Sequence, residues 1–270
     1  MYIYYIMKYF NIFIIILLLI LLISYLFNFE YCLEKKNVIM TTYFCKKKDP
    51  QRKKYASCND IKYIKVWYDS IKKLDLNGII FHDGLDNEFI KKYKTDKINF
   101  IYINSSDYNL SLNDLRFLVY LEYLEKNKNI KNVFMTDGND VTVKMNPFEK
   151  LDFKNIYAGS EKNPGLKWVD IKVEVYNKNN KLNFDRNKIK LLYNAGILGG
   201  NRENILIFLE KMKEKFLNID DKYKNSNLNM IVFNDIIYNE INIDIKTGFP
   251  LHSVYKEYEN KRDDIFFIHK

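Results

Sequence analysis

Two carboxylates, Asp137 and Asp140, stand close together directly after the apolar run 132–135 (NVFM). β-Branched and aromatic residues of this kind form buried strands, and the carboxyl end of such a strand is where α/β sheets bind ligands. Gly138 and Asn139 tolerate positive φ, so the chain can turn tightly and bring both carboxylates together. They repel each other unless a cation or proton lies between them. The spacing predicts a Mg²⁺ or Mn²⁺ site; a surface Asx turn with solvated aspartates is the alternative.

The elements that would position this pair alternate between strands and helices. Apolar runs and helical spacing predict, in chain order, a strand at 37–44, a helix at 60–74, strands at 79–81 and 98–104, a helix at 112–124 and the strand that ends at the aspartates. This order predicts an α/β fold with a mostly parallel sheet flanked by helices and ligands at its carboxyl edge. The sequence has no GxGxxG after the first strand and no GxxxxGK[ST], which disfavours Rossmann dehydrogenases and P-loop enzymes.

The second half of the chain is less regular. A short strand at 156–159 leads into Ser160 and Glu161, and residues 162–190, rich in Asn and Lys, predict an irregular excursion that faces an acceptor. Small residues predict turns at 194–196 and 199–201, the first of which would let a ligand approach the backbone closely. Helices are expected at 202–216 and 229–240, followed by a final strand at 265–268.

The N-terminus predicts a membrane anchor. Residues 9–29 carry no charge, and about 20 apolar residues suffice to cross the hydrocarbon core. Aromatic residues flank the run, and no small-residue cleavage site follows it, which disfavours a signal peptide. We expect an uncleaved single-pass anchor at 1–30, a short stem at 31–36 and one domain at 37–270. Lysines are more numerous after the run than before it, which favours a cytosolic domain.

Composition limits the partners only weakly. The net charge is +9, but the lysines are scattered among Asn, Ile and Tyr, as an AT-rich coding bias would produce, so nucleic-acid binding is not expected. An acidic, phosphate-bearing substrate explains the charge at least as well. The three cysteines, Cys32, Cys45 and Cys58, have no spacing typical of zinc sites or disulfide frameworks. Their spacing leaves both a Cys45–Cys58 bridge and free thiols open.

Together these features resemble a GT-A type glycosyltransferase, the nucleotide-diphospho-sugar transferase fold, over about residues 38–270. The resemblance rests on a first strand ending in small polar residues, an acidic motif after the fourth strand, NPF downstream, NAGxxGG, an acidic residue in a later helix and a terminal His. The usual DxD is here Asp137-x-x-Asp140. That spacing is similar to the transferase domain of collagen hydroxylysine glycosyltransferases, which also pair two aspartates with a late His.

The resemblance implies a metal-dependent, hexosyltransferase-like enzyme that moves a sugar from a nucleotide sugar, expected to be a UDP-sugar, to a protein, lipid or glycan acceptor. Asp137, Asp140 and His269 would hold Mn²⁺ or Mg²⁺, one aspartate also reaching the ribose, and Lys270 would neutralise pyrophosphate charge. The family arrangement is type II in an endomembrane of the Golgi or ER kind, which conflicts with the orientation that the lysines favour.

Further site residues follow from the same resemblance. The donor would be bound by Thr41 and Thr42 at the base, by Arg116, and by Asn194, Ala195 and Gly196 around the sugar. The acceptor-side carboxylate would act as a general base or bind a sugar hydroxyl. Asp235 is the first candidate for it and Glu161 the second. Each has a plainer interpretation: strand-end threonines, a solvated arginine, a tight turn, a helix-surface aspartate or, for His269, a frayed chain end.

Two other functions are compatible with the fold. One is a GT-A-like interaction module without catalysis, which an intact set of two aspartates and a histidine disfavours. The other is a nucleotidyltransferase, which also binds a metal ion through two carboxylates but normally carries a Gly-rich basic loop after the first strand. The loop here, CKKKDPQRKK, contains no glycine, so we disfavour this alternative.

Overall fold

The computed structural model describes residues 12–22 and 35–270, apart from 180–181, 254, 256–261 and 263. The chain divides into two units, Met1–Lys36 and Asn37–Lys270. In the first, residues 12–22 are helical, and the rest of the predicted anchor and stem lies outside the described residues, except for 35 and 36. Among the described residues no helix has both the length and the apolar character that a membrane span requires.

The second unit is built on a mixed, mostly parallel sheet. In the described part of the chain seven strands follow the order β3-β2-β1-β4-β7-β6-β8. β1 pairs with β2, β2 with β3 and β6 with β8 in parallel, whereas β7 is antiparallel to β4 and β6. The strands are β1 (Lys36–Tyr43), β2 (Gly78–His82), β3 (Ile98–Tyr102), β4 (Ile130–Thr136), β6 (Ile156–Glu161), β7 (Leu192–Asn201) and β8 (Ile245–Lys246). The predicted α/β class is confirmed.

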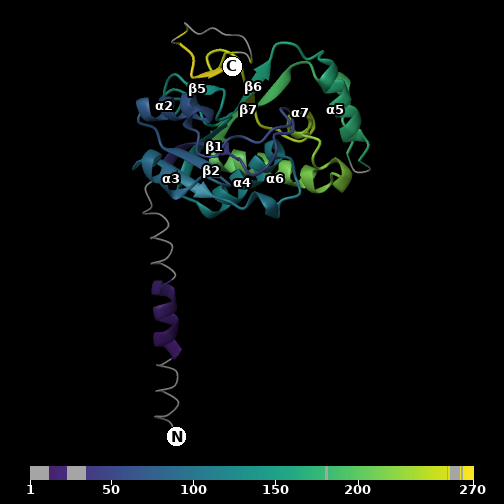
Figure 1. Cartoon of the computed structure of the whole chain (residues 1–270). Helices are drawn as coiled ribbons and strands as arrows, with labels where there is room; N and C mark the ends of the chain where they lie inside the picture. The colour runs from purple at the N-terminus through teal and green to yellow at the C-terminus, as the bar shows by residue number, and fades with distance from the viewer. Residues whose placement is uncertain (1–11, 23–34, 180–181, 254, 256–261, 263) are drawn as a thin grey trace. The chain divides into compact units, whose positions relative to one another are not determined.

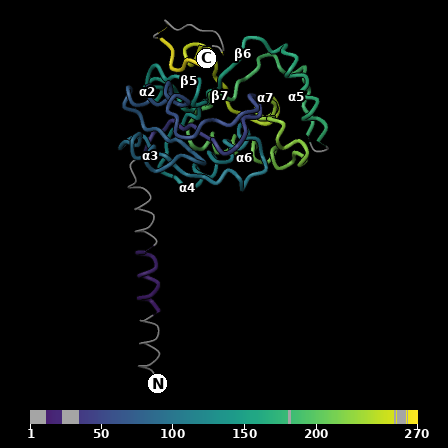
Figure 2. The backbone as a smooth tube through the Cα atoms, in the orientation of Figure 1, coloured from purple at the N-terminus to yellow at the C-terminus, as the bar shows by residue number. Residues whose placement is uncertain are grey.

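A separate apolar core covers each face of the sheet, as the alternation of strand side chains requires. In β1, Val38 and Met40 belong to one core and Ile39 to the other. The first core is closed by α4 (Leu112–Lys126), α5 (Lys167–Asn177), α6 (Arg202–Leu217) and α7 (Asn229–Asn239). The second is closed by α2 (Lys65–Lys73), α3 (Asn87–Tyr93) and a two-stranded ribbon of β5 (Val141–Val143) and β9 (Phe267–His269). Figures 1 and 2 show α2 and α3 at one side of the domain and α5 at the other.

Strand order reverses beside β1. From β1 the chain adds β2 and β3 on one side and then returns to place β4 on the other. In open α/β sheets, ligands bind outside the carboxyl ends of the strands at such a switch point. Thr42, near the end of β1, and Asp137, directly after β4, therefore lie where a ligand site is expected.

The predicted turns at 194–196 and 199–201 are wrong, because both segments belong to the long strand β7. Gly199 lies opposite Phe134 in the β4–β7 ladder, and a Cβ at Gly199 would stand 2.2 Å from Cδ1 of the Phe134 ring. The glycine thus leaves room for a buried aromatic ring rather than permitting a turn.

Two other segments differ from expectation. Residues 162–190, predicted to be irregular, contain α5, whose Val169, Val173 and Tyr176 are buried in the first core. The final strand is β9, two residues later than the start predicted, and it pairs with the unpredicted β5. His269 is therefore held inside a strand, opposite Val141. The short elements α3 and β8 were not predicted either, and short 3-10 turns occur at Ile61–Tyr63, Ser105–Asp107, Arg186–Lys188 and Asp221–Tyr223.

The basic loop after β1 is tied to the domain at its base. A disulfide joins Cys45 to Cys58, which resolves the choice that the sequence left open. The Asp83 carboxylate accepts hydrogen bonds from the backbone N–H of Cys45, at 2.7 Å, and of Lys46, at 3.2 Å. Lys47 Nζ donates to the carbonyl oxygen of Leu110 at 2.9 Å. These contacts fix the position of a loop that is otherwise rich in solvated charge.

Replacing Cys45 and Cys58 together by serine should lower the free energy of unfolding, because the bridge spans 13 residues and closing a loop of that length contributes about 3 kcal/mol. Urea denaturation of oxidised chain measures the change, with Cys32→Ser as the matched control. Equal stability of the double variant and the wild type would contradict the assignment.

Candidate metal centre and ligand pocket

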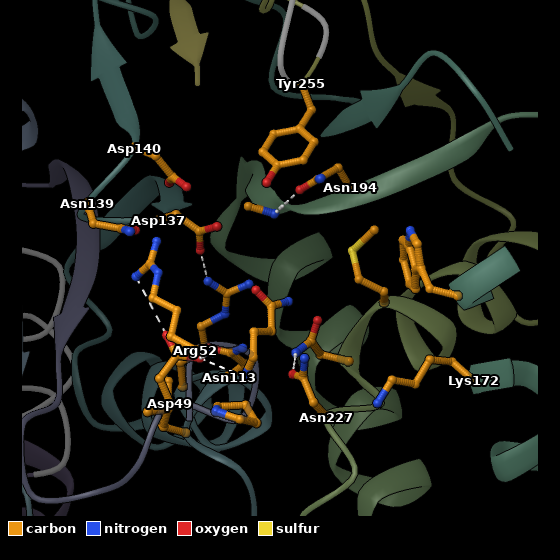
Figure 3. A pocket seen from close by; sticks show the side chains of 18 of the residues that line it. Asp49, Arg52, Asn113, Asp137, Asn139, Asp140, Lys172, Asn194, Asn227 and Tyr255 are labelled. Atoms are coloured by element: carbon orange, nitrogen blue, oxygen red, sulfur yellow. Dashed lines mark hydrogen bonds and ion pairs between the residues drawn. The ribbon is translucent and has the colours of Figure 1, made fainter. Parts of the chain in front are cut away.

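The Asp137–Asp140 turn joins β4 to β5. The backbone N–H of Asp137 donates to the carbonyl oxygen of Gly196 in β7 at 3.0 Å, which fixes the start of the turn. Gly138 packs so closely against β1 that a Cβ would lie 2.7 Å from Oγ1 of Thr41. The turn therefore needs a glycine for space. It brings the two carboxylates to the same side, as Figure 3 shows.

His269 completes a group of three potential ligands. Its side chain is only 2% exposed, and neither ring nitrogen has a hydrogen-bond partner. Nε2 lies 3.8 Å from Oδ2 of Asp137 and 3.8 Å from Oδ1 of Asp140. One ligand atom from each residue falls within 4.8 Å of the others. Leaving a buried polar atom without a partner costs about 1–3 kcal/mol, so this imidazole is placed to receive a ligand.

The residues fit a divalent cation. Two carboxylates and a neutral imidazole form a mixed oxygen and nitrogen donor set, which suits Mn²⁺ better than Mg²⁺, because Mg²⁺ prefers oxygen ligands alone. Gly196 leaves the space they require, because a Cβ there would lie 2.3 Å from Cε1 of His269 and 2.7 Å from Oδ2 of Asp137. Gly196 in β7 thus makes room for the site and does not form a turn.

Burial shifts the pKa values of His269 and Asp140 in ways that matter for metal binding. It lowers the pKa of His269 to about 3, helped by the nearby His252 and Arg116, so the ring is neutral at physiological pH and its lone pair is available. Burial also raises the pKa of Asp140 to about 6, against the opposing effect of Arg116 and Arg52. A cation would relieve the cost of keeping this carboxylate ionised.

Two arginines flank the aspartates. Arg116, on α4, forms an ion pair with Asp137 and donates from Nη2 to the carbonyl oxygen of Ala195 at 3.0 Å. Arg52 lies at the tip of the Cys45–Cys58 loop and points toward the same turn (Figure 3). When the amide of Asn139 is oriented to satisfy its neighbours, its oxygen accepts from both Nη atoms of Arg52, at 3.1 and 2.9 Å. Arg52 also forms an ion pair with Asp49 in its own loop, at 3.5 Å, so Arg116 is the guanidinium that contacts a carboxylate of the metal group directly.

Most of the predicted site residues gather around one cavity of about 1110 Å³; those that line it are Thr42, Arg116, Asp137, Asp140, Glu161, Asn194, Gly196 and His269. Asn194 in β7 links Glu161 in β6 to the backbone of Gly196. Its amide nitrogen donates to Oε1 of Glu161 at 2.9 Å, and its oxygen accepts from the backbone N–H of Gly196 at 2.7 Å. The Glu161 carboxylate is therefore held in a fixed orientation beside the metal ligands.

Four predicted residues lie elsewhere. Thr41 is fully buried and donates to the carbonyl oxygen of Thr136, and Ala195 is buried behind the site. Lys270 is exposed, and its side chain is not among the described residues that line the cavity. Asp235 accepts from the Tyr176 hydroxyl at 2.6 Å and pairs with Lys215 at 2.8 Å. Its carboxylate is engaged between α5, α6 and α7, away from the cavity lining.

The sequence interpretation missed two walls of the cavity. One is the tip of the basic loop, 49–53, and the other is formed by α5 with the loop 225–227. Arg52 was hidden among many lysines, but the two cysteines that bracket the loop are a signal that it has a fixed shape. The α5 wall was hidden because residues 162–190 were predicted to be irregular.

Comparison with known proteins identifies no family for this chain. No protein-family model matches the chain, and no curated protein matches its sequence.

Asp140→Asn should stabilise the metal-free protein at pH 7.5. The folded pKa of Asp140 is about 6, against an ordinary value of 3.8, so folding favours the protonated carboxyl. The resulting contribution to the free energy of unfolding is fully present below pH 4 and is lost as the pH rises through 6. Removing the charge should therefore recover about 2–3 kcal/mol at pH 7.5 and little at pH 4. Urea unfolding at both pH values tests this, with the exposed Asp96→Asn as control. A variant less stable than wild type at pH 7.5 would show that the carboxylate is structural.

Gly196→Ala should weaken Mn²⁺ binding by at least about tenfold, the effect of displacing groups that orient metal ligands, because the new Cβ collides with His269. Gly200→Ala, in the same strand, is the matched control: its nearest contact would be 3.3 Å, to Ile205. Calorimetric titration with Mn²⁺ measures both variants, and their melting temperatures show whether each is folded. Equal Mn²⁺ affinities in folded proteins would refute the assigned ligand geometry.

Proposed function

We propose that the unit 37–270 is a metal-dependent glycosyltransferase of the GT-A type, which uses a nucleotide sugar, in the first instance a UDP-sugar, together with Mn²⁺ or Mg²⁺. One observation carries the proposal: a buried histidine whose ring nitrogens lack partners faces two carboxylates at the switch point of an α/β sheet. An interaction module without catalysis would gain nothing from a buried imidazole that lacks a partner.

The charges around the cavity support an anionic donor. The described lining carries five cationic side chains, Arg52, Lys53, Arg116, Lys162 and Lys172, against four carboxylates, Asp49, Asp137, Asp140 and Glu161. A bound divalent cation therefore leaves an excess of positive charge in the cavity. A nucleoside diphosphate brings a matching negative charge, and arginine binds phosphate oxygens through two parallel hydrogen bonds. A neutral ligand beside the metal would leave this charge unsatisfied.

Asp137, Asp140 and His269 would hold the metal, which when bound supplies Lewis-acid stabilisation of the departing diphosphate. In the transfer itself, an acceptor hydroxyl oxygen forms a bond to the anomeric carbon of the donor. The bond from that carbon to the diphosphate oxygen breaks, and its electron pair leaves with the nucleoside diphosphate. The hydroxyl proton passes to the Glu161 carboxylate, which Asn194 orients. Arg52 and Arg116 stand where they can bind the leaving diphosphate.

Binding of UDP with Mn²⁺ to the full chain should raise its melting temperature more than either component does alone, because donor and metal share one site. A panel of nucleotide sugars tested for slow hydrolysis would then identify the donor. Arg52→Gln should reduce the UDP-dependent shift, whereas Lys54→Gln, on the same loop but not lining the cavity, should leave it unchanged. If neither UDP nor GDP shifts the melting temperature with Mn²⁺ present, the proposal fails.

Glu161→Gln should lower turnover while leaving the affinity for UDP and Mn²⁺ near that of wild type, since the amide keeps the shape but cannot accept the proton. Losing a general base typically costs about 10²–10⁴-fold in rate. Steady-state donor hydrolysis and transfer assays measure the change. Unchanged turnover would remove Glu161 from the mechanism.

A further inference from the structure

The cavity continues well beyond the metal ligands. Figure 3 shows Asn227 and Lys172 across the cavity from Asp140 and Arg52, with Asn113 between the two sides. Its volume, about 1110 Å³, exceeds the upper end of the range of about 300–1,000 Å³ that is usual for a single small-molecule site. There is room for a second ligand beside a nucleotide sugar.

This distal part of the cavity, which we call the amide wing, has a distinct lining. Its lining combines the side-chain amides of Asn113, Asn225 and Asn227 with apolar side chains, namely Leu166, Trp168, Ile171, Val175 and Met230. Lys172 also lines this part, and its Nζ donates to the carbonyl oxygen of Ser226. The carboxylates that line the cavity, namely Asp49, Asp137, Asp140 and Glu161, belong to the Arg52 loop or surround the metal ligands.

The amide wing is held in place before any ligand binds. Asp114, buried in the first turn of α4, accepts from the backbone N–H of Asn229 at 2.7 Å and of Leu228 at 3.3 Å. Asn227 adopts a left-handed conformation with φ of 56°, and its Oδ1 accepts from Nδ2 of Asn229 at 2.9 Å. On the other side of the loop, the backbone N–H of Ser226 donates to the carbonyl oxygen of Tyr223 at 2.8 Å. These contacts fix the loop 225–227, and a preorganised loop loses little entropy on binding.

The chemistry of this wing suits a polyhydroxylated ligand. A carboxamide offers both donors and an acceptor, as hydroxyl groups do, and the Lys172 ammonium already donates to a backbone carbonyl. Trp168 is 36% exposed. Its flat apolar ring surface suits the C–H face of a sugar ring, and its indole N–H gives it a polar edge. We propose that the amide wing binds a saccharide acceptor, so that the transferred sugar extends a glycan; as an acceptor site, this assignment rests on the function proposed above.

The chain contains two tryptophans, and this makes the proposal testable by fluorescence. Trp67 is fully buried, so acrylamide should quench mainly Trp168. Millimolar lactose, cellobiose and N,N′-diacetylchitobiose serve as probes on the full chain, with and without UDP and Mn²⁺. At least one disaccharide should protect Trp168 from acrylamide, and Trp168→Phe should abolish the protected signal.

Asn227→Gly removes the amide but keeps the left-handed backbone, and it should weaken disaccharide binding about tenfold, the value of one well-formed hydrogen bond. Asn59→Gly is the matched control, because Asn59 also has a positive φ, 61°, and does not line the cavity. Equal losses in both variants, or none in Asn227→Gly, would overturn the assignment.

A melting shift with UDP and Mn²⁺, measured on the same samples, separates the two proposals. If the shift persists while no disaccharide protects Trp168, or while phosphatidylcholine vesicles or an unstructured peptide protect it instead, the saccharide assignment fails and the donor site stands. If a disaccharide protects Trp168 but UDP and Mn²⁺ give no shift, the donor site fails while the wing is supported as a saccharide site.

Discussion

The convergence of two half-buried carboxylates on a buried histidine without hydrogen-bond partners constrains this whole site. Asp137, Asp140 and His269 converge within 4.8 Å, where two carboxylates repel each other and an imidazole has no hydrogen bond. Water would normally relieve both costs, but the histidine is almost fully buried. A divalent cation satisfies the three groups at once. The free energy that the fold gives up to hold them together is therefore recoverable on metal binding.

The sheet is shaped to create that convergence. Strand β4 delivers Asp137 at the switch point, and the small ribbon of β5 and β9 carries Asp140 and His269 to the same place. Strand β7 crosses behind them with a glycine, Gly196, at the position where any side chain would collide with His269. The Asp137–Asp140 turn and β9, which are distant in sequence, thus meet where the long antiparallel strand β7 passes closely behind them.

Local sequence patterns predict much of this arrangement, but they cannot predict contacts that depend on the tertiary structure. Apolar runs located β1, β2, β3 and β4, and the Asp137–Asp140 spacing predicted the acidic pair. Glycines were misassigned because a glycine that makes room for a ring, such as Gly199, cannot be distinguished in sequence from one that makes a turn. Asp235 was misplaced for a related reason: a carboxylate on an apolar helix face can be satisfied by Tyr176 and Lys215, which only the tertiary structure brings to it.

The central claim is that one cation binds Asp137, Asp140 and His269 together. Pulsed electron paramagnetic resonance of the Mn²⁺-loaded protein tests this directly, because a nitrogen ligand modulates the electron spin echo. We expect a ¹⁴N modulation in the wild type that disappears in His269→Gln, while Mn²⁺ remains bound more weakly through the two aspartates. A Mn²⁺ complex whose wild-type spectrum lacks nitrogen coupling, or whose coupling survives the loss of His269, would contradict the account.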